Sequence, residues 1–158
     1  VHETILGFAD CNIELLTIHL SGGEKMITAA IAAAKTFQTK VIGVSVLTSL
    51  TDVDTKALFQ TTSEEQATKL FKLANETGID GIVCSPLELK LASNLLSPEI
   101  LRITPGIRDS AADDDQSRTM TANEAIQHGA SYLVIGRPIS KAPNVSEALK
   151  YFAQSIHE

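Results

Sequence analysis

The sequence predicts an α/β protein of five consecutive βα units that form part of an eight-stranded barrel. Apolar runs of strand length alternate with longer segments of helical periodicity, which is typical of βα units. In two places, "ETGIDGIVCS" and "QHGASYLVIG", a predicted helix ends at a glycine and a predicted strand follows. The last two strands each end beside an arginine, and barrels frequently bind phosphate at the loops after their last strands.

The predicted strands are nearly continuous apolar runs, as expected for parallel strands with both faces covered. They are residues 14–20, 40–46, 81–85, 101–104 and 132–136. The helices between them show apolar residues at helical spacing, and cover residues 23–37, 63–78, 86–96, 121–130 and 144–156. Ser63 is a typical helix start, and Thr121 with Glu124 fits a capping box.

Two closures of such a sheet are compatible with these elements: an open doubly wound sheet, or part of a barrel. No GxGxxG and no P-loop occurs, so the nucleotide-binding fingerprints of the open folds are absent. Together with the arginines at the last two strands, this favours the barrel. Because 158 residues suffice for one domain with a core and not for two, residues 1–158 are expected to form a single domain.

Composition excludes several classes of partner. Apolar residues make up 44% and charged residues 20% of the chain, as in folded globular proteins. The net charge of −6 leaves no basic stripe for nucleic acid, so any anion site must be local. No apolar run approaches the roughly 20 residues that span a bilayer, and no membrane partner is expected. Cys11 and Cys84 are predicted to be reduced, buried thiols of a cytoplasmic protein.

Two strand ends predict the anion site. "YLVIGR" places Gly136 and Arg137 after an apolar run, and "RITPGIR" places Arg108 after a Pro-Gly turn. Gly136 lacks a Cβ, so a ligand can approach its N–H, and arginine donates paired hydrogen bonds to phosphate oxygens. The alternatives are a surface arginine paired with a carboxylate and an ordinary Pro-Gly turn. The position of both arginines on consecutive strands favours the phosphate site.

For other polar residues that follow the predicted strands, the sequence allows both a role in the site and a purely structural role. Gln116 lies near the end of the loop "DSAADDDQSR", an acidic run that is by default a solvated surface segment, but a neutral amide there can also bridge a phosphate and a base. Thr48 can bind the polar edge of a heterocycle, although threonine is also common in turns. His19 is either a general acid or base or, more commonly, a structural histidine, and the roles of His19 and Ser21 stay open. No metal-ligand spacing occurs, so no metal is expected.

These motifs resemble those of the bacterial orotidine 5′-phosphate decarboxylases. "HLSGG", "VSVLTSL", "GIDGIVCS", "TPGIR" with "DDQSR", and "YLVIGRPI" have the order and spacing of that family across essentially the whole chain. The resemblance implies a TIM barrel, usually a homodimer, that converts orotidine 5′-phosphate to UMP in pyrimidine synthesis without a cofactor. It assigns Thr48 to the pyrimidine, Gln116 to a lid between base and phosphate, and Arg108, Gly136 and Arg137 to the phosphate.

One part of the family pattern does not occur in these 158 residues: the catalytic strand end Asp-x-Lys-x-x-Asp, followed by Ile-Pro-Asn-Thr. "VHETILGFAD" resembles the helix after it, so the resemblance places the catalytic lysine and aspartates upstream of Val1. It then implies an incomplete barrel with strands four to eight, lacking the first three, and the isolated residues are expected to be inactive. Two alternatives remain: a related barrel of the hexulose-phosphate synthase type, which uses a metal, and a non-catalytic phosphate-binding fragment.

Overall fold

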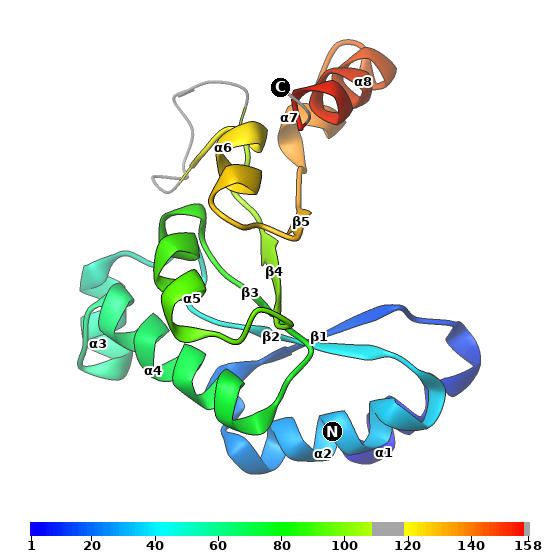
Figure 1. Cartoon of the computed structure of the whole chain (residues 1–158), viewed down its shortest axis with the longest axis vertical. Coiled ribbons are helices and arrows are strands. Elements are labelled where there is room, and N and C mark those ends of the chain that lie inside the picture. The colour runs from blue at the N-terminus through cyan, green and yellow to red at the C-terminus, as the bar shows by residue number, and fades with distance from the viewer. Residues whose placement is uncertain (109–118, 157–158) are drawn as a thin grey trace.

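The computed structural model describes residues 1–108 and 119–156. Its five strands form one parallel sheet in the order β1-β2-β3-β4-β5 (Figure 1). Because parallel neighbours require a crossover, a helical segment follows each strand before the next begins. The strands are β1 Leu15–His19, β2 Lys40–Val44, β3 Gly81–Val83, β4 Leu101–Thr104 and β5 Tyr132–Leu133. The predicted parallel α/β sheet is confirmed.

The helices lie around the outside of the curved sheet (Figure 1). They are α1 His2–Leu6, α2 Glu24–Ala34, α3 Asp52–Phe59, α4 Ser63–Thr77, α5 Leu89–Leu95, α6 Ala122–Gln127, α7 Arg137–Ser140 and α8 Val145–Ser155. Short 3₁₀ turns are η1 Ala9–Cys11, η2 Leu20–Gly22, η3 Lys35–Phe37 and η4 Pro86–Glu88.

The first described residues form a helix, as the resemblance of "VHETILGFAD" to a family helix implied. Val1 is the N-cap of α1, and its carbonyl accepts a hydrogen bond from the Ile5 N–H at 2.9 Å. The Val1 side chain is exposed, whereas Ile5 is buried in the core cluster. Ile5 therefore packs α1 against the core, and the Val1 carbonyl closes the first helical turn.

Two local features differ from the sequence prediction. The last predicted strand is too long: β5 ends at Leu133, Gly136 is the N-cap of α7, and Arg137 is the first helical residue. The prediction also missed α3, because Val53 and Leu58 are exposed and disturb the apolar periodicity of that helix. A capping box at its start, between Thr51 and the residue three positions later, was the available signal.

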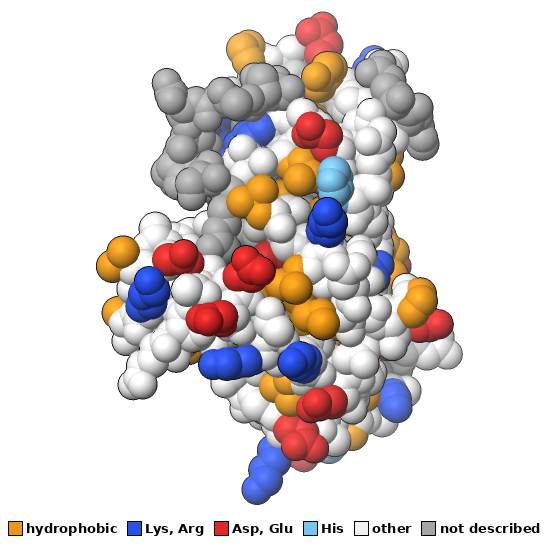
Figure 2. Space-filling model, turned by 60° about the vertical axis from the view of Figure 1, so that its left-hand side comes forward, with side chains coloured by type: hydrophobic (Ala, Val, Ile, Leu, Met, Phe, Trp, Pro, Cys, Tyr) orange, Lys and Arg blue, Asp and Glu red, His pale blue; other side chains and the backbone are white. Residues whose placement is uncertain are grey.

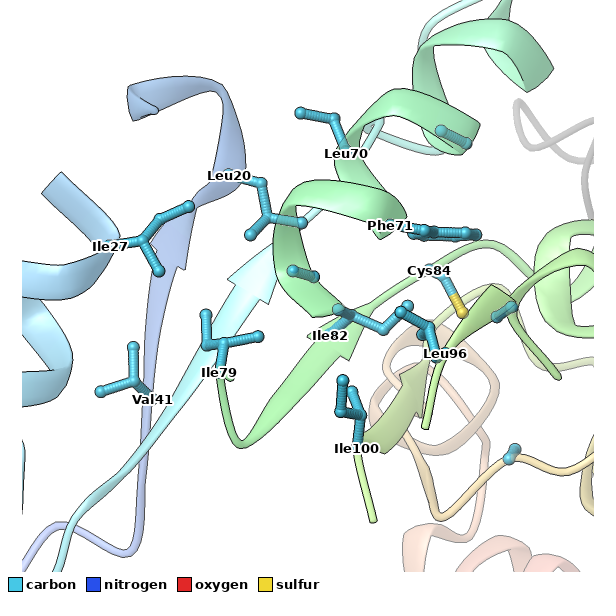
Figure 3. Packing of buried hydrophobic residues seen from close by; sticks show 14 of the residues in the cluster. Leu20, Ile27, Val41, Leu70, Phe71, Ile79, Ile82, Cys84, Leu96 and Ile100 are labelled. Atoms are coloured by element: carbon cyan, nitrogen blue, oxygen red, sulfur yellow. The ribbon is translucent and has the colours of Figure 1, made fainter. Parts of the chain in front are cut away.

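The core lies between the sheet and the helices (Figure 3). Val41 and Ile82, on neighbouring strands, belong to one cluster with Leu20 and Phe71, and all four side chains are fully buried. Gly43 is required in the middle of β2, because a Cβ there would overlap the side chain of Leu20. Leu20 follows β1 directly, so this close packing holds the carboxyl ends of β1 and β2 together.

The other face of the sheet is only partly covered within the described residues. Strand register places Thr17 and His19 of β1 on the same face as Val44 and Val83, and the first two are exposed and the last two half-buried. Ile103, also on this face, is buried but lies outside the cluster formed with the helices. The expectation that both faces of the strands are covered therefore holds fully for one face only among the described residues, because the crossovers place the helices on one side.

The two cysteines have different environments. Cys84 is buried and Cys11 is exposed, and both are free thiols, so the prediction of a buried thiol is wrong for Cys11. Cys11 lies in η1, a short turn without buried residues, outside the core cluster. Burial, reinforced by the charge of Glu88, raises the pKa of Cys84 to about 12. Cys84 therefore remains a thiol and packs as a small apolar residue.

The surface mixes charges of both signs. Figure 2 shows acidic and basic side chains interspersed over the face that it presents, with hydrophobic side chains in small separate groups between them. Within residues 1–108 and 119–156, no helix is long and apolar enough to cross a membrane.

Helix α4 begins with a capping box that makes its stability depend on pH. Its N-cap is Thr62, one residue before the predicted start, and the Thr62 backbone N–H donates to the Glu65 carboxylate at 3.0 Å. That bond, with hydroxyl hydrogen bonds from Thr61 and Thr62, lowers the pKa of Glu65 to about 2. A carboxylate whose pKa falls on folding stabilises the folded state above its unfolded pKa, and loses that contribution as the pH falls.

We expect Glu65→Gln to flatten the decline in stability between about pH 4.5 and pH 2, the interval between the unfolded and folded pKa of Glu65. Thermal unfolding midpoints of the variant and the wild type, measured across this interval, test the expectation. Glu64→Gln is the matched control, since it removes the same charge from the same helical turn outside the capping box. Parallel curves for Glu65→Gln and the wild type would contradict the assignment.

Candidate functional site

The predicted phosphate-binding arginines follow neighbouring strands. Thr104 of β4 pairs with Leu133 of β5, and Arg108 and Arg137 each come four residues after their member of this pair. Because the strands are parallel, both arginines come after the carboxyl edge of the sheet. Gln116 lies outside the described residues.

Arg108 is held between two chain segments. Gly106 has a φ of 79°, a left-handed conformation that favours glycine, and turns the chain after β4. The Arg108 N–H then donates to the Met120 carbonyl at 3.0 Å, and the Met120 N–H donates to the Gly106 carbonyl at 3.3 Å. The Arg108 guanidinium donates to the Ile107 carbonyl at 2.8 Å, and the residue is 8% exposed. This arginine is therefore positioned by backbone contacts on both sides.

A cavity of about 180 Å³ lies beside Arg108. Thr121 and Asn123 of the α6 segment line it, together with Tyr151 and Phe152 of α8. Arg137 is not among its lining residues. The structure thus brings the two arginines to the same edge of the sheet and does not place both in this cavity.

Gly136 and Arg137 form the start of α7. Gly136 is exposed, its φ is −98°, and a Cβ at this position would meet no atom within 4 Å. Neither packing nor a left-handed conformation therefore requires glycine here. Arg137 is half-buried, and its carbonyl accepts a hydrogen bond from the Lys141 N–H at 2.9 Å.

Thr48 lies in a turn beyond β2. The Leu50 N–H donates to the Leu47 carbonyl at 3.0 Å, which closes the turn around Thr48 and Ser49. Thr48 is half-buried, and Val46, 4% exposed, anchors the incoming chain in the core. The turn therefore presents Thr48 at the same edge of the sheet as the arginines, two strands away from Arg108's strand.

A second cavity, of about 220 Å³, lies at the base of this turn. His19 and Ser21, whose roles the sequence left open, line it beside Ser45, Leu50 and Phe59. Sequence reasoning missed Ser45, although its place at the end of an apolar strand, three residues before Thr48, was visible. Within the described residues, no group of three or more His, Cys, Asp or Glu side chains is arranged to hold a metal ion.

Known proteins match nearly the whole chain. A sequence model described as "Orotidine 5'-phosphate decarboxylase / HUMPS family" matches residues 3–152. The orotidine 5′-phosphate decarboxylase of Saccharophagus degradans is 42% identical over 160 residues, which cover 99% of this chain and 67% of that protein. The protein of the same name from a Wolbachia of Brugia malayi is 41% identical over 157 residues, covering 99% of this chain and 70% of that protein.

Solved structures agree. The orotidine 5′-phosphate decarboxylase of Lactobacillus acidophilus superposes with a TM-score of 0.81 at 28% identity, over 99% of this chain and 69% of that one. The Methanocaldococcus jannaschii enzyme, complexed with the inhibitor BMP, has a TM-score of 0.72 over 100% of this chain and 70% of that one. At 22% identity it shows the shared fold alone. The TIM-barrel-like α/β fold class is confirmed.

This chain spans about two thirds of the length of these curated relatives. The matches cover 99% of the chain and lend no support to the expectation that its residues are an inactive fragment. That the family's lysine and aspartates lie upstream of Val1 stays a prediction. The matching curated relatives are decarboxylases, so the prediction of a carboxy-lyase family is confirmed. The chain belongs to the orotidine 5′-phosphate decarboxylase / HUMPS family.

Proposed function

We propose that the protein takes part in the decarboxylation of orotidine 5′-phosphate to UMP in pyrimidine synthesis. The observation that carries this proposal is the equal spacing of Arg108 and Arg137 beyond a registered residue pair of β4 and β5. Two arginines at the carboxyl edge of neighbouring parallel strands suit a phosphate, since barrels commonly bind phosphate at their last two strands.

The proposed ligand contacts divide between the phosphate and the base. Arg108 and Arg137 bind the phosphate, and Gly136 allows it to approach the backbone. Packing gives no other reason for glycine at that position, because a Cβ there would meet nothing within 4 Å. Thr48 contacts the pyrimidine, and Gln116 spans base and phosphate. The turn between Leu47 and Leu50 supports this role, because it presents Thr48 at the same edge of the sheet.

In this proposal the chain supplies binding energy remote from the reacting carbon. Loss of CO₂ leaves a carbanion on the base, which a lysine would stabilise and then protonate. The Asp-x-Lys-x-x-Asp pattern that the resemblance assigns to this step is not among the 158 residues, so we give none of them a chemical role. Their proposed role is binding: the energy of phosphate binding can drive closure of a loop over the substrate, which orders the site and excludes water from it.

The architecture belongs to the same proposal. We assign the five strands to strands four to eight of a (β/α)₈ barrel, with residues 1–158 as one domain. The helices around one face of the sheet support this assignment, because a barrel has its helices outside. A cytoplasmic homodimer is also proposed. Val53 and Leu58 of α3 are 76% and 64% exposed, and exposed apolar side chains of this kind are suited to burial in a subunit interface.

Titration calorimetry of the protein with UMP, uridine and ribose 5-phosphate tests the proposal. We expect UMP to bind most tightly and uridine roughly 100-fold more weakly, since two charge-assisted hydrogen bonds contribute at least about 3 kcal/mol together. Equal affinities for UMP and uridine would refute the phosphate site. Equal affinities for UMP and ribose 5-phosphate, with binding that requires a divalent metal, would favour the hexulose-phosphate synthase type instead.

A further inference from the structure

We propose that Ser45 is a positioning residue that fixes the Thr48 turn and thereby sets the preference of the site for a pyrimidine base. The inference rests on the proposed function, in which Thr48 contacts the base. Ser45 touches no ligand in this account. It acts through the backbone that carries Thr48.

Ser45 joins β2 to β3 by two hydrogen bonds to a single acceptor. The ladder between these strands ends at the pair Val44 and Val83. One residue further, the Ser45 backbone N–H donates to the Val83 carbonyl at 3.1 Å, and the Ser45 hydroxyl donates to the same oxygen at 2.8 Å. Ser45 is 6% exposed, so water has little access to compete for this carbonyl.

The double contact lies where the chain leaves the sheet. Val46 enters the core, the turn from Leu47 to Leu50 follows, and α3 begins after the capping residue Thr51. The far end of the loop is therefore fixed by the capping box and the near end by Ser45. The cavity of about 220 Å³ beneath the turn, which Ser45 lines, leaves space into which the turn can move when the near end is released.

Removal of the hydroxyl should change position rather than folding. In Ser45→Ala the backbone N–H still donates to the Val83 carbonyl, so the strands stay paired. The constraint on the first residue of the loop is weaker, and Thr48 is three residues further along. In an enzyme, a misplacement of about 1 Å can lower the reaction rate by up to roughly 100-fold. We expect a smaller displacement of Thr48 in Ser45→Ala, and therefore a roughly tenfold weaker affinity for a ligand that carries the base.

The same strand provides a matched control at its opposite end. Thr39 precedes β2, is also 6% exposed, and its hydroxyl donates to the Ile13 carbonyl at 2.7 Å. Thr39→Ala therefore removes a side-chain hydrogen bond of the same kind, with the same burial, from the edge remote from Thr48. Loss of stability alone should affect both variants similarly, whereas a positioning effect should appear only in Ser45→Ala.

The experiment compares the Kd values for UMP and ribose 5-phosphate. We expect Ser45→Ala to raise the Kd for UMP roughly tenfold and that for ribose 5-phosphate less than about twofold. Ser45→Thr, which keeps a hydroxyl, should restore the wild-type ratio. Thr39→Ala should leave the ratio of the two constants unchanged.

A double-mutant cycle with Thr48→Val tests whether Ser45 affects UMP binding through Thr48. If Ser45 acts through Thr48, Ser45→Ala should change the Kd for UMP less than about twofold once Thr48 is valine. Equal weakening of both ligands by Ser45→Ala, the same change in Thr39→Ala, or a tenfold effect that persists in the Thr48→Val background would each overturn the inference. A wild-type protein that binds neither ligand would defeat the proposed function, and this inference with it.

Discussion

Arg137→Ala should weaken UMP binding roughly 100-fold while leaving uridine binding within about twofold. The proposed contact is a pair of charge-assisted hydrogen bonds from the guanidinium to phosphate oxygens, and uridine has no phosphate to lose. Arg137 is half-buried at the start of α7, so its guanidinium group is less free to move than that of a fully exposed arginine. Titration calorimetry with the two ligands measures both constants.

Lys141→Ala is the control for this prediction. Lys141 is exposed, comes four residues later at the end of α7, and carries the same charge. Its removal should alter UMP binding less than about threefold, the effect of a screened surface charge. Arg137→Lys should fall between the wild type and alanine, because lysine keeps the charge without the bidentate geometry. A similar loss for UMP and uridine in Arg137→Ala would show that the arginine supports the fold instead.

Phe71→Ala should lower the free energy of unfolding by roughly 3–5 kcal/mol, the largest stability effect that we expect in this chain. Phe71 lies on α4, is 0% exposed, and belongs to the cluster that joins this helix to the sheet beside Ile82 and Cys84 (Figure 3). Alanine would leave a cavity in a core that relaxes only partly. Denaturation in urea measures the loss.

Phe59→Ala is the matched comparison, since the same side-chain atoms are removed from a residue that is 38% exposed at the end of α3. Its expected cost is below about 1.5 kcal/mol, because less apolar surface returns to water. Comparable losses from both substitutions would mean that α4 does not organise the core as the structure indicates.

Local sequence patterns predicted most of the elements because the cause of each is local. The apolar runs that became β1 and β4 are bounded by turn residues, and the capping box of Thr121 and Glu124 starts α6 where expected. The end of β5 could not be found in this way. Residues 134–136 continue the apolar run of the strand, but the registered pairs with β4 end at Leu133 and α7 begins shortly afterwards.

The candidate site divides in the same manner. The strand ends that carry Arg108 and Arg137 were predictable, because in a parallel sheet every strand must end at the same edge. The side-chain surroundings were not. Arg108 lines a cavity with Tyr151 and Phe152, more than 40 positions away in the sequence, and only the packing of α8 brings them together. Ser45 likewise acquires its partner, Val83, through strand pairing.

The sequence by itself determined the five strands, most of the helices, the order of these elements, and the edge at which polar residues gather. Each of these depends on residues close together in the chain: the apolar runs, the capping pairs, and the glycines beside the strand ends. Only the tertiary structure decided that helices cover one face, that Gly43 makes room for Leu20, and which side chains surround each arginine. Those outcomes depend on volume and hydrogen-bond partners contributed by distant segments, which no local pattern contains.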